Sequence, residues 1–576
     1  MPVKISSHIC IDKVIYPSSI KFFHPLLPTR QIMKFDTSLI DARKETMIKN
    51  GFWKNRTIEH FFSHALKTQA DKTAIVAYNV DGKKSPPIRL SYRQLNERID
   101  SIAKSLIRLG IQRSDVVSFQ IPNSWEFIAL SLACARIGAV ANPLMPIFRD
   151  HELSYMLKFL ESKVFIVPSV FKNFNYEEMA QGLLPKIDTL QHIVVLGGEG
   201  ENSFDKLLLA DSSPEPLVAD PVKPDDILIL MFTSGTTGEP KAVMHTSNTL
   251  FAALDGFVDA LEVKDSEIIL GASPMAHLTG YGYLAMLPIM LNSTTVVMDS
   301  WDPDIALQII KDEAVTFSMA SSPFVLDMCN ATEKGAPRSP QFTKFCCAGA
   351  PIPPIVVERA HKVMNLTVCS AWGMTENGAI TITSPSMALE KSSISDGKAI
   401  PGIELKIADG NDNELPRGET GRLLVRGASQ CVGYYKKPEL NALTEDDWFD
   451  SGDLAFMDQE GYIRINGRSK DIVIRGAENI PVIEIENLLY QHPSIATVAI
   501  VGFPDERLGE RACAFVTLKE GASFSFEEMI QYLKEKKVAN QYFPEKLEIR
   551  SDLPRTPSGK LQKFMLRDEA KSFRID

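Results

Sequence analysis

The sequence predicts an α/β protein with two parts: a large N-terminal domain of helix-covered, mostly parallel sheets and a small α+β C-terminal lobe. Two observations support this prediction. Helix-like and strand-like segments alternate from Trp53 onward, which is typical of parallel sheets covered by helices. After Arg468 this pattern changes to shorter, mixed segments. The change predicts a domain boundary near residue 468.

The alternating segments of the large domain can be placed individually. We expect a helix over Leu95–Leu109, a strand over Val116–Ile121, an apolar helix over Trp125–Ile137 and a strand over Ala139–Leu144. Further strands are expected from short, continuous apolar runs, which are typical of buried strands. These runs are Val164–Val167, Ile193–Leu196, Ile227–Phe232 and Thr294–Met298.

The C-terminal lobe has its own pattern. Its expected elements are a strand at Asp471–Ile474, a helix at Glu484–Tyr490, strands at Ala496–Val501 and Ala512–Leu518, and a helix at Phe526–Lys536. We therefore divide the chain into residues 45–468 and a lobe of residues 469–576, which has the size of a small domain. Residues 1–44 are expected to be a disordered extension, or to precede a true start at Met33.

Composition excludes several classes of protein. With 44% hydrophobic and 23% charged residues the chain is typical of soluble globular proteins, and its net charge of −10 argues against a nucleic-acid binder. No apolar stretch approaches the ~18 residues that a membrane span needs, although peripheral membrane contact stays open. Eight cysteines without a Cys-x-x-Cys pair indicate neither a zinc site nor a disulfide framework, and they favour a cytoplasmic location. The oligomeric state is not readable from the sequence.

A dense cluster of hydroxyls and glycines follows the apolar run that ends at Phe232. Its candidate phosphate-binding residues are Thr233, Ser234, Gly235, Thr236, Thr237, Gly238 and Lys241. Backbone N–H groups and hydroxyls in such a loop can surround phosphate oxygens, and a lysine adds positive charge. Glu239 and Pro240 separate the last glycine from the lysine, so this is not the usual NTPase phosphate loop. Taken alone, the cluster could be an ordinary turn.

Four further motifs occur downstream in a fixed order. They are Trp372–Glu376, Ser451–Asp453, Gly467–Asp471 and Pro554–Lys560. Together with the Thr233–Lys241 loop they resemble the adenylate-forming superfamily of acyl-CoA synthetases, luciferases and peptide-synthetase adenylation domains. The resemblance covers roughly residues 52–567. Gly51–Trp53, Ala371–Glu376 and Asp505–Arg511 look most like the branch of medium-chain fatty-acyl-CoA synthetases and cyclohexanecarboxylate–CoA ligases.

The resemblance implies a nucleotide site. The Thr233–Lys241 loop would hold the β- and γ-phosphates of ATP, Thr375 would contact the α-phosphate, and Glu376 would bind Mg²⁺, a cation that prefers such oxygen ligands. The remaining nucleotide contacts would come from Trp372 and Gly373 beside adenine, Gly349, Ala350 and Pro351 on the adenine side, Asp453 at the ribose hydroxyls and Arg468 at ribose or phosphate. Outside the motif order, several of these residues would be read as caps, turns or core.

The resemblance also implies roles in catalysis and movement. His277 would be a gate beside the acyl site, and Lys560 would enter the active site to stabilise charge on the α-phosphate. Lys470 would be the hinge about which the lobe turns, and Arg475 and Gly476 would then line the tunnel for the pantetheine arm of CoA. The catalytic set is thus Lys560, Thr375, Glu376 and His277.

The implied function is an ATP-dependent, AMP-forming acid–CoA ligase that uses Mg²⁺. Its substrates would be ATP, CoA and a carboxylic acid with an uncharged acyl group, expected to be a medium-chain fatty, alicyclic or aryl acid. The acyl pocket is expected from small and apolar residues in 273–283, 321–324, 347–350 and 372–379. Two alternatives stay open: an enzyme that loads a carrier-protein pantetheine, and a catalytically silent nucleotide-binding module.

Overall fold

The structure of the protein is a computed structural model. It describes residues 35–80, 85–210, 217, 219–233, 240–349, 352, 354–441, 443–444, 446–468, 473–476, 478–554 and 563–574. Among these residues no helix is both long and apolar enough to cross a membrane. The proposed hinge, Lys470, and the proposed catalytic lysine, Lys560, lie outside the described residues. The domain boundary at residue 468 therefore stays a prediction.

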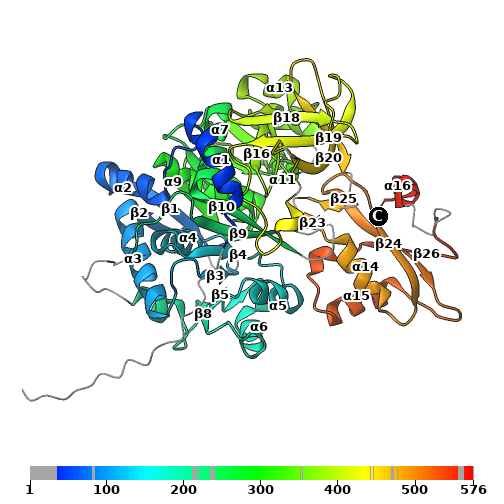
Figure 1. Cartoon of the computed structure of the whole chain (residues 1–576), viewed down its shortest axis with the longest axis horizontal. Helices are drawn as coiled ribbons and strands as arrows, with labels where there is room; N and C mark the ends of the chain where they lie inside the picture. The colour runs from blue at the N-terminus through cyan, green and yellow to red at the C-terminus, as the bar shows by residue number, and fades with distance from the viewer. Residues whose placement is uncertain are drawn as a thin grey trace, which may run out of the picture. The chain divides into compact units, whose positions relative to one another are not determined.

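The first large sheet has nine strands among the described residues, of which β1, β2 and β16 are labelled in Figure 1. Its strands in spatial order are β17 (Lys398–Ala399), β16 (Gly378–Ile382), β15 (Thr367–Met374), β14 (Lys344–Cys347), β13 (Phe317–Ala320), β11 (Ile268–Gly271), β12 (Thr294–Met298), β1 (Thr73–Tyr78) and β2 (Ile88–Ser91). The strands from β15 to β1 are mutually parallel, whereas β2, β16 and β17 pair antiparallel at the edges. Parallel strands of this kind are the expected ones.

The second sheet has the same parallel character. Its order is β10 (Lys241–Thr246), β9 (Ile227–Thr233), β4 (Val140–Pro143), β3 (Val116–Phe119), β5 (Val164–Pro168) and β8 (His192–Leu196). The β9–β10 pair is an antiparallel hairpin, and the remaining pairs are parallel. A short ribbon of β6 (Val170–Phe171) and β7 (Phe174–Asn175) accompanies this sheet.

Two smaller sheets follow. The third is an antiparallel sheet of β18 (Ile403–Ala408), β19 (Thr420–Gly427), β20 (Phe449–Met457) and β21 (Ile463–Arg468). The fourth, in the C-terminal lobe, contains β23 (Glu478–Ile480), β22 (Val473–Arg475), β25 (Gly509–Leu518), β24 (Ile495–Asp505) and β26 (Lys546–Arg550). The predicted fold class, parallel α/β sheets with a smaller α+β lobe, is confirmed.

Helices cover these sheets (Figure 1). The helices of the N-terminal domain are α1 (Ser38–Lys49), α2 (Ile58–Gln69), α3 (Tyr92–Arg108), α4 (Trp125–Ile137), α5 (Asp150–Phe159), α6 (Tyr176–Leu183), α7 (Ser247–Leu261), α8 (Leu278–Gly280), α9 (Leu287–Leu291), α10 (Pro303–Asp312), α11 (Ser322–Glu333), α12 (Pro354–Arg359) and α13 (Ala388–Lys391). Those of the lobe are α14 (Val482–Tyr490), α15 (Phe526–Glu535) and α16 (Lys563–Ala570). Residues 38–44, which we assigned to the extension, lie in α1.

Helix α4 shows why its sequence is apolar on all sides. It contacts β1 of the first sheet and β4 of the second, and it also packs against α3. Eleven of its thirteen residues are buried. A helix that is hydrophobic all round is stable only where every face is covered. The apolar run at Trp125–Ile137 therefore indicates a helix that joins two sheets into one core.

Candidate active site

The turn between β15 and β16 is the centre of the candidate site. Thr375, Glu376 and Asn377 form this turn, and strand pairing resumes at Gly378. The strands come very close at Gly373, where a Cβ atom would lie 1.7 Å from the Gly378 carbonyl oxygen. Only glycine fits there. Gly373 is therefore required by the backbone of this hairpin, whatever it contacts in a ligand.

His245 holds one side of this turn. It lies in β10, and its Nε2 is 2.6 Å from the carbonyl oxygen of Thr375, while its Nδ1 is 3.1 Å from Oγ1 of Thr249. Because a carbonyl oxygen can only accept, Nε2 carries the proton and donates to Thr375. Burial lowers the pKa of His245 to about 4, so the ring is neutral at physiological pH.

The segment after β19 holds the other side. The Tyr434 hydroxyl donates to Oε1 of Glu376 at 2.7 Å, and the Cys431 N–H donates to the Glu376 carbonyl oxygen at 2.6 Å. The Ser429 hydroxyl donates to the carbonyl oxygen of Asn377 at 2.7 Å. Glu376 is only 6% exposed. Its carboxylate is therefore fixed in position by bonds from a distant part of the chain.

The predicted phosphate loop begins and ends beside this turn. Thr233 is the last residue of β9 and Lys241 the first of β10, and the two are register partners in the hairpin. Residues 234–239 lie outside the described residues. The Lys241 ammonium lies 4.8 Å from the centroid of the Tyr434 ring, the same tyrosine that bonds Glu376. Two motifs far apart in sequence thus meet at one side chain.

Trp372 and Asp453 also come together. The indole Nε1 of Trp372 donates to Oδ2 of Asp453 at 3.1 Å, and the backbone N–H of Asp453 donates to the Ser451 hydroxyl oxygen at 3.1 Å. Asp453 is 4% exposed and is the register partner of Arg468 across β20 and β21. Three residues predicted for adenine and ribose therefore occupy one corner of the site.

A cavity lies between this turn and the C-terminal lobe. Its walls are Pro143, Met145, Phe148, Glu152, Met156, Met231, Phe232, Thr233, Pro240, Ala276, His277, Leu278, Thr375, Glu478, Pro481, Glu484 and Tyr542. Burial lowers the pKa of His277, so it faces the cavity as a neutral ring. Three predicted residues, Thr233, His277 and Thr375, share this one space.

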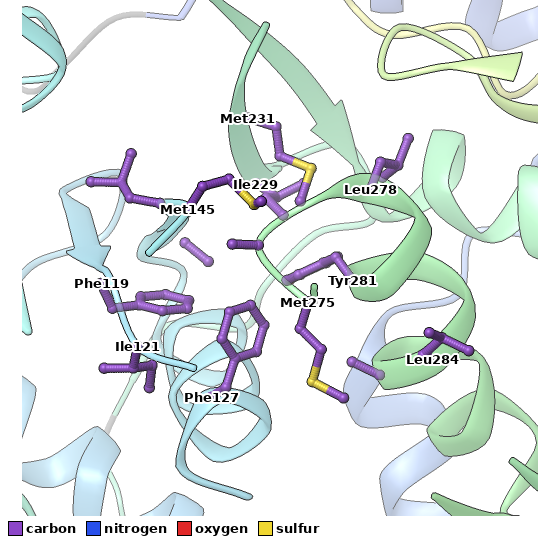
Figure 2. Close-up of a cluster of buried hydrophobic side chains, with 14 of the residues drawn as sticks. Phe119, Ile121, Phe127, Met145, Ile229, Met231, Met275, Leu278, Tyr281 and Leu284 are labelled. Carbon is purple, nitrogen blue, oxygen red and sulfur yellow. The ribbon is translucent and has the colours of Figure 1, made fainter. Parts of the chain in front are cut away.

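The floor of the cavity is apolar. Figure 2 shows a packed cluster in which Met145, Met231 and Leu278 lie above Phe119 and Phe127. The first three of these side chains also line the cavity. The cluster joins strands of the second sheet to the helical segment that begins at α8. An uncharged acyl group fits such a surface, because it is removed from water there.

The remaining predicted site residues lie either outside the described residues or away from the cavity. Ser234, Gly235, Thr236, Thr237, Gly238, Ala350, Pro351, Lys470 and Lys560 lie outside the described residues. Gly349 follows β14 with φ of +90°, and it is not among the described residues that line the cavity. Of the expected pocket walls, 273–283 and 372–379 contribute to the lining, whereas 321–324 and the described part of 347–350 do not.

The two predicted tunnel residues lie in the β22–β23 hairpin. Gly476 has φ of +63°, a left-handed conformation that favours glycine. The Arg475 guanidinium pairs with Glu545 at 2.7 Å and donates to the Gln541 carbonyl oxygen at 3.1 Å. Arg475 thus fastens the hairpin to the segment that carries Tyr542. A role in a CoA tunnel stays a prediction for both residues.

Sequence reasoning missed His245 and Tyr434. His245 is a histidine in a buried strand, and a lone histidine of this kind is usually structural. Tyr434 precedes a second tyrosine in a loop, with no motif around it. No signal in the local sequence distinguishes these residues, because their partners lie in other elements.

Comparison with known proteins decides the family. Residues 62–435 match the family model described as AMP-binding enzyme, and residues 484–560 match the AMP-binding enzyme C-terminal domain. The chain belongs to the AMP-binding enzyme family. The resemblance predicted from the motif order is confirmed.

Several relatives of this AMP-binding enzyme match along nearly their whole length. A medium-chain fatty-acid–CoA ligase of Escherichia coli (strain K12) is 32% identical over 93% of this chain and 94% of its own. A 2,3-dihydroxybenzoate–AMP ligase of Bacillus subtilis (strain 168) is 31% identical over 93% and 98%. Among solved structures, the amide bond synthetase McbA of Marinactinospora thermotolerans is 26% identical, with a TM-score of 0.77 over 88% of this chain and 99% of its own.

We expect the buried, neutral His245 to make the free energy of unfolding fall as the pH is lowered. The folded protein keeps His245 neutral down to about pH 4, whereas the unfolded chain protonates it near 6.5. Between these values the unfolded state binds more protons. The free energy of unfolding contributed by His245 is thus fully present above pH 6.5 and falls by up to about 1.4 kcal/mol per pH unit below it.

His245→Gln should remove this dependence. Denaturant unfolding at pH 7 and pH 5 should show a stability loss on acidification about 2 kcal/mol smaller than in the wild type. His64→Gln, at an exposed histidine of α2, serves as the control and should keep the wild-type loss. Equal losses for His245→Gln and His64→Gln would contradict the assignment.

Proposed function

We propose that this AMP-binding enzyme is an ATP-dependent, AMP-forming acid–CoA ligase. In the first step, a carboxylate oxygen of the acid attacks the α-phosphorus of ATP, and pyrophosphate leaves. In the second step, the sulfur of CoA attacks the carbonyl carbon of the acyl-adenylate, and AMP leaves. The products are acyl-CoA, AMP, pyrophosphate and one proton.

One observation supports this proposal most strongly. Thr375 and Glu376 lie in a turn that hydrogen bonds from His245 and Tyr434 hold in place, beside a cavity with an apolar floor. Both reactants of the first step are anions, so an enzyme must align them and neutralise charge. The clamp from His245 and Tyr434 gives Thr375 and Glu376 fixed positions for that purpose. The apolar floor accepts the tail of the acid beside them.

The residues present fit a magnesium ion. Glu376 accepts the Tyr434 hydroxyl at Oε1, and no residue that the structure describes bonds its other carboxylate oxygen. That oxygen would bind the cation, and phosphate oxygens of ATP would complete the ligand set. Bound Mg²⁺ would neutralise charge on the phosphates. Glu376 would hold the ion, and Tyr434 would orient Glu376.

The nucleotide would lie across the corner that Trp372 and Asp453 form. Asp453, held by the Trp372 indole, would accept the ribose hydroxyls, and Arg468 would add a further contact. The loop from Thr233 to Lys241 would surround the β- and γ-phosphates and retain pyrophosphate until it leaves. Thr375 would donate to the α-phosphate, where Lys560 would stabilise the charge that develops during attack.

We further propose that the acid is of medium size. Met145, Phe148, Met156, Met231 and Leu278 give the cavity wall flexible, apolar side chains. The E. coli relative is a medium-chain fatty-acid–CoA ligase and the B. subtilis relative activates 2,3-dihydroxybenzoate, which supports a fatty or aryl acid.

A substrate panel tests the proposed function and the size of the acid. Pyrophosphate release and acyl-CoA formation would be measured with acids from acetate to palmitate, with benzoate and with cyclohexanecarboxylate, each with and without CoA. Each methylene that fits is worth about 0.8 kcal/mol, so kcat/KM should rise several-fold per CH₂ to an optimum at roughly six to ten carbons. Acyl-CoA should be the product.

A pocket variant sharpens this test. Leu278→Ala should move the optimum to longer acids, because it enlarges the floor. Leu307→Ala, the same change in a separate buried cluster, should keep the wild-type optimum. An optimum at acetate or palmitate would contradict the medium-size pocket. Pyrophosphate release without acyl-CoA would favour a carrier-protein acceptor, and the absence of both would indicate a silent module.

The proposed role of Lys560 separates the two half-reactions. Lys560→Ala should slow adenylation by about 10²–10³-fold, the effect of losing one electrostatic donor, while thioester formation from pre-made acyl-adenylate persists. Lys571→Ala removes an exposed lysine of the same lobe, paired with Asp568, and should leave both steps unchanged. Equal losses of Lys560→Ala in both steps would show that the lysine is structural.

A further inference from the structure

We propose that Glu478 is the general base of thioester formation: it accepts the proton of the CoA thiol as the sulfur attacks the acyl-adenylate. The inference rests on the proposed ligase function and goes beyond it, because it assigns the proton transfer of the second step to a named side chain. Glu478 comes from the C-terminal lobe. Thr375 and His277, which line the same cavity, come from the N-terminal domain.

The fold places Glu478 in the cavity wall. It is the first residue of β23, paired with Arg475 of β22 across the tight turn at Gly476. Two bonds of the Arg475 guanidinium, to Glu545 and to the Gln541 carbonyl oxygen, hold this hairpin against the segment of Tyr542. Glu478 and Tyr542 therefore line the same part of the cavity.

Contacts between the lobe and helix α5 keep the hairpin there. The first turn of α5 binds the lobe three times: Asp150 pairs with Lys537 at 2.8 Å, His151 with Glu484 at 2.7 Å, and Oε1 of Glu152 accepts the Ala539 N–H at 3.2 Å. In this arrangement Glu478 lines the same cavity as Thr375 and His277, beside which the acyl-adenylate is proposed to lie. It is thus present in the conformation in which a thiol would meet the acyl group.

Three carboxylates line this cavity, and their hydrogen bonds distinguish them. Glu152 accepts from the N–H groups of Arg149 and Ala539, and Glu484 bonds His151. The backbone of Glu478 pairs with Arg475, but its carboxylate has no hydrogen bond or ion pair to any other residue that the structure describes. Both Glu478 oxygens are therefore left to accept a proton from a ligand, as a general base requires.

The environment also adjusts the basicity of Glu478. Burial raises its pKa to about 7, against about 4.3 for an ordinary glutamate. A thiol has a pKa of about 8.5. Burial therefore reduces the difference between the pKa of the thiol and that of the glutamate from about 4 to about 1.5, which makes proton transfer to Glu478 less unfavourable. The titratable groups around it are Glu152, Glu484, His151, His277 and Tyr542. Lys536 also lies near His151.

The step balances as follows. The S–H bond breaks and its proton moves to a carboxylate oxygen of Glu478, while the sulfur electron pair forms the S–C bond. The bond between the acyl carbon and the phosphate oxygen then breaks, and AMP leaves with that electron pair. Glu478 returns its proton to water. At a pH below about 7 Glu478 becomes protonated, so thioester formation should slow.

Single-turnover reactions of pre-made acyl-adenylate with CoA test the proposal. Glu478→Gln should slow acyl-CoA formation by about 10²–10³-fold, within the usual range of general-base catalysis, and should keep adenylation near the wild-type rate. The wild-type rate should rise to a plateau above about pH 7. The Glu478→Gln rate should instead keep rising until the thiol itself ionises. Glu478→Asp, which keeps a carboxylate, should retain the plateau at a reduced rate.

A thiol of low pKa distinguishes general-base catalysis by Glu478 from a structural role of this residue, because such a thiol needs no base. Trifluoroethanethiol is acidified by its fluorines, so it attacks largely as the thiolate and should react with both enzymes at rates within about fivefold. N-acetylcysteamine, an ordinary thiol of similar size, should show the full loss in Glu478→Gln. Glu484→Gln weakens the contact with α5, and it should slow both thiols alike.

The outcomes are distinct. An equal loss for both thiols in Glu478→Gln, or an unchanged pH profile, would overturn the proposal and make Glu478 structural. A wild-type rate in Glu478→Gln would overturn it as well. Failure of the proposed ligase function would be seen in the wild-type enzyme, which would then form no acyl-CoA from any acid. Failure of the Glu478 proposal would be seen only in the comparison of the variants with the wild type.

Discussion

The site depends on the clamping of one turn from both sides. Thr375 and Glu376 project from the end of the first sheet, where a turn alone would leave their side chains free to move. His245, from the second sheet, fixes the carbonyl oxygen of Thr375, and Tyr434 fixes the carboxylate of Glu376. Because these bonds are buried, breaking one leaves a polar group without a partner, which costs about 1–3 kcal/mol. The geometry of the site is therefore determined by hydrogen bonds to the β15–β16 turn from the second sheet and from the segment after β19.

The same turn links the chemical parts of the site. Lys241, at the end of the phosphate-loop hairpin, lies over the Tyr434 ring, so the loop and the carboxylate share one support. Trp372, two residues before Met374 in β15, reaches the third sheet through Asp453. The C-terminal lobe adds Glu478 to the lining of the cavity. The first and second sheets and the lobe thus line one cavity, the third sheet holds Trp372 through Asp453, and the proposed two-step reaction uses all four sheets.

Local sequence patterns predicted the elements well, because each depends on neighbouring residues. The strand at Thr294–Met298 has the predicted bounds, and the helix predicted over Phe526–Lys536 is Phe526–Glu535. The helix predicted from Leu95 begins at Tyr92 instead, because Ser91 and Gln94 form a reciprocal cap. The strands β24 and β25 extend past their apolar runs, because they pair with each other as far as Asp505 and Gly509.

The assembly of the site was less predictable. The motif order indicated which segments belong to the site, and the structure brings Trp372 to Asp453 and Thr233 to Thr375. The supporting residues could not be found in this way. Tyr434 is 58 positions from Glu376. The sequence around these two residues does not indicate that the segment after β19 packs against the turn. Such pairings depend on the register of whole sheets.

The Mg²⁺ dependence of adenylation in Tyr434→Phe tests this account most directly. The variant removes the hydroxyl that orients Glu376 and keeps the ring beneath Lys241. Tyr435→Phe is the matched control, because the Tyr435 hydroxyl is buried without a hydrogen-bond partner among the described residues. The account predicts that Tyr434→Phe needs about 10- to 100-fold more Mg²⁺ for half-maximal pyrophosphate release, while Tyr435→Phe behaves like the wild type. An unchanged Mg²⁺ requirement in a folded Tyr434→Phe enzyme would contradict it.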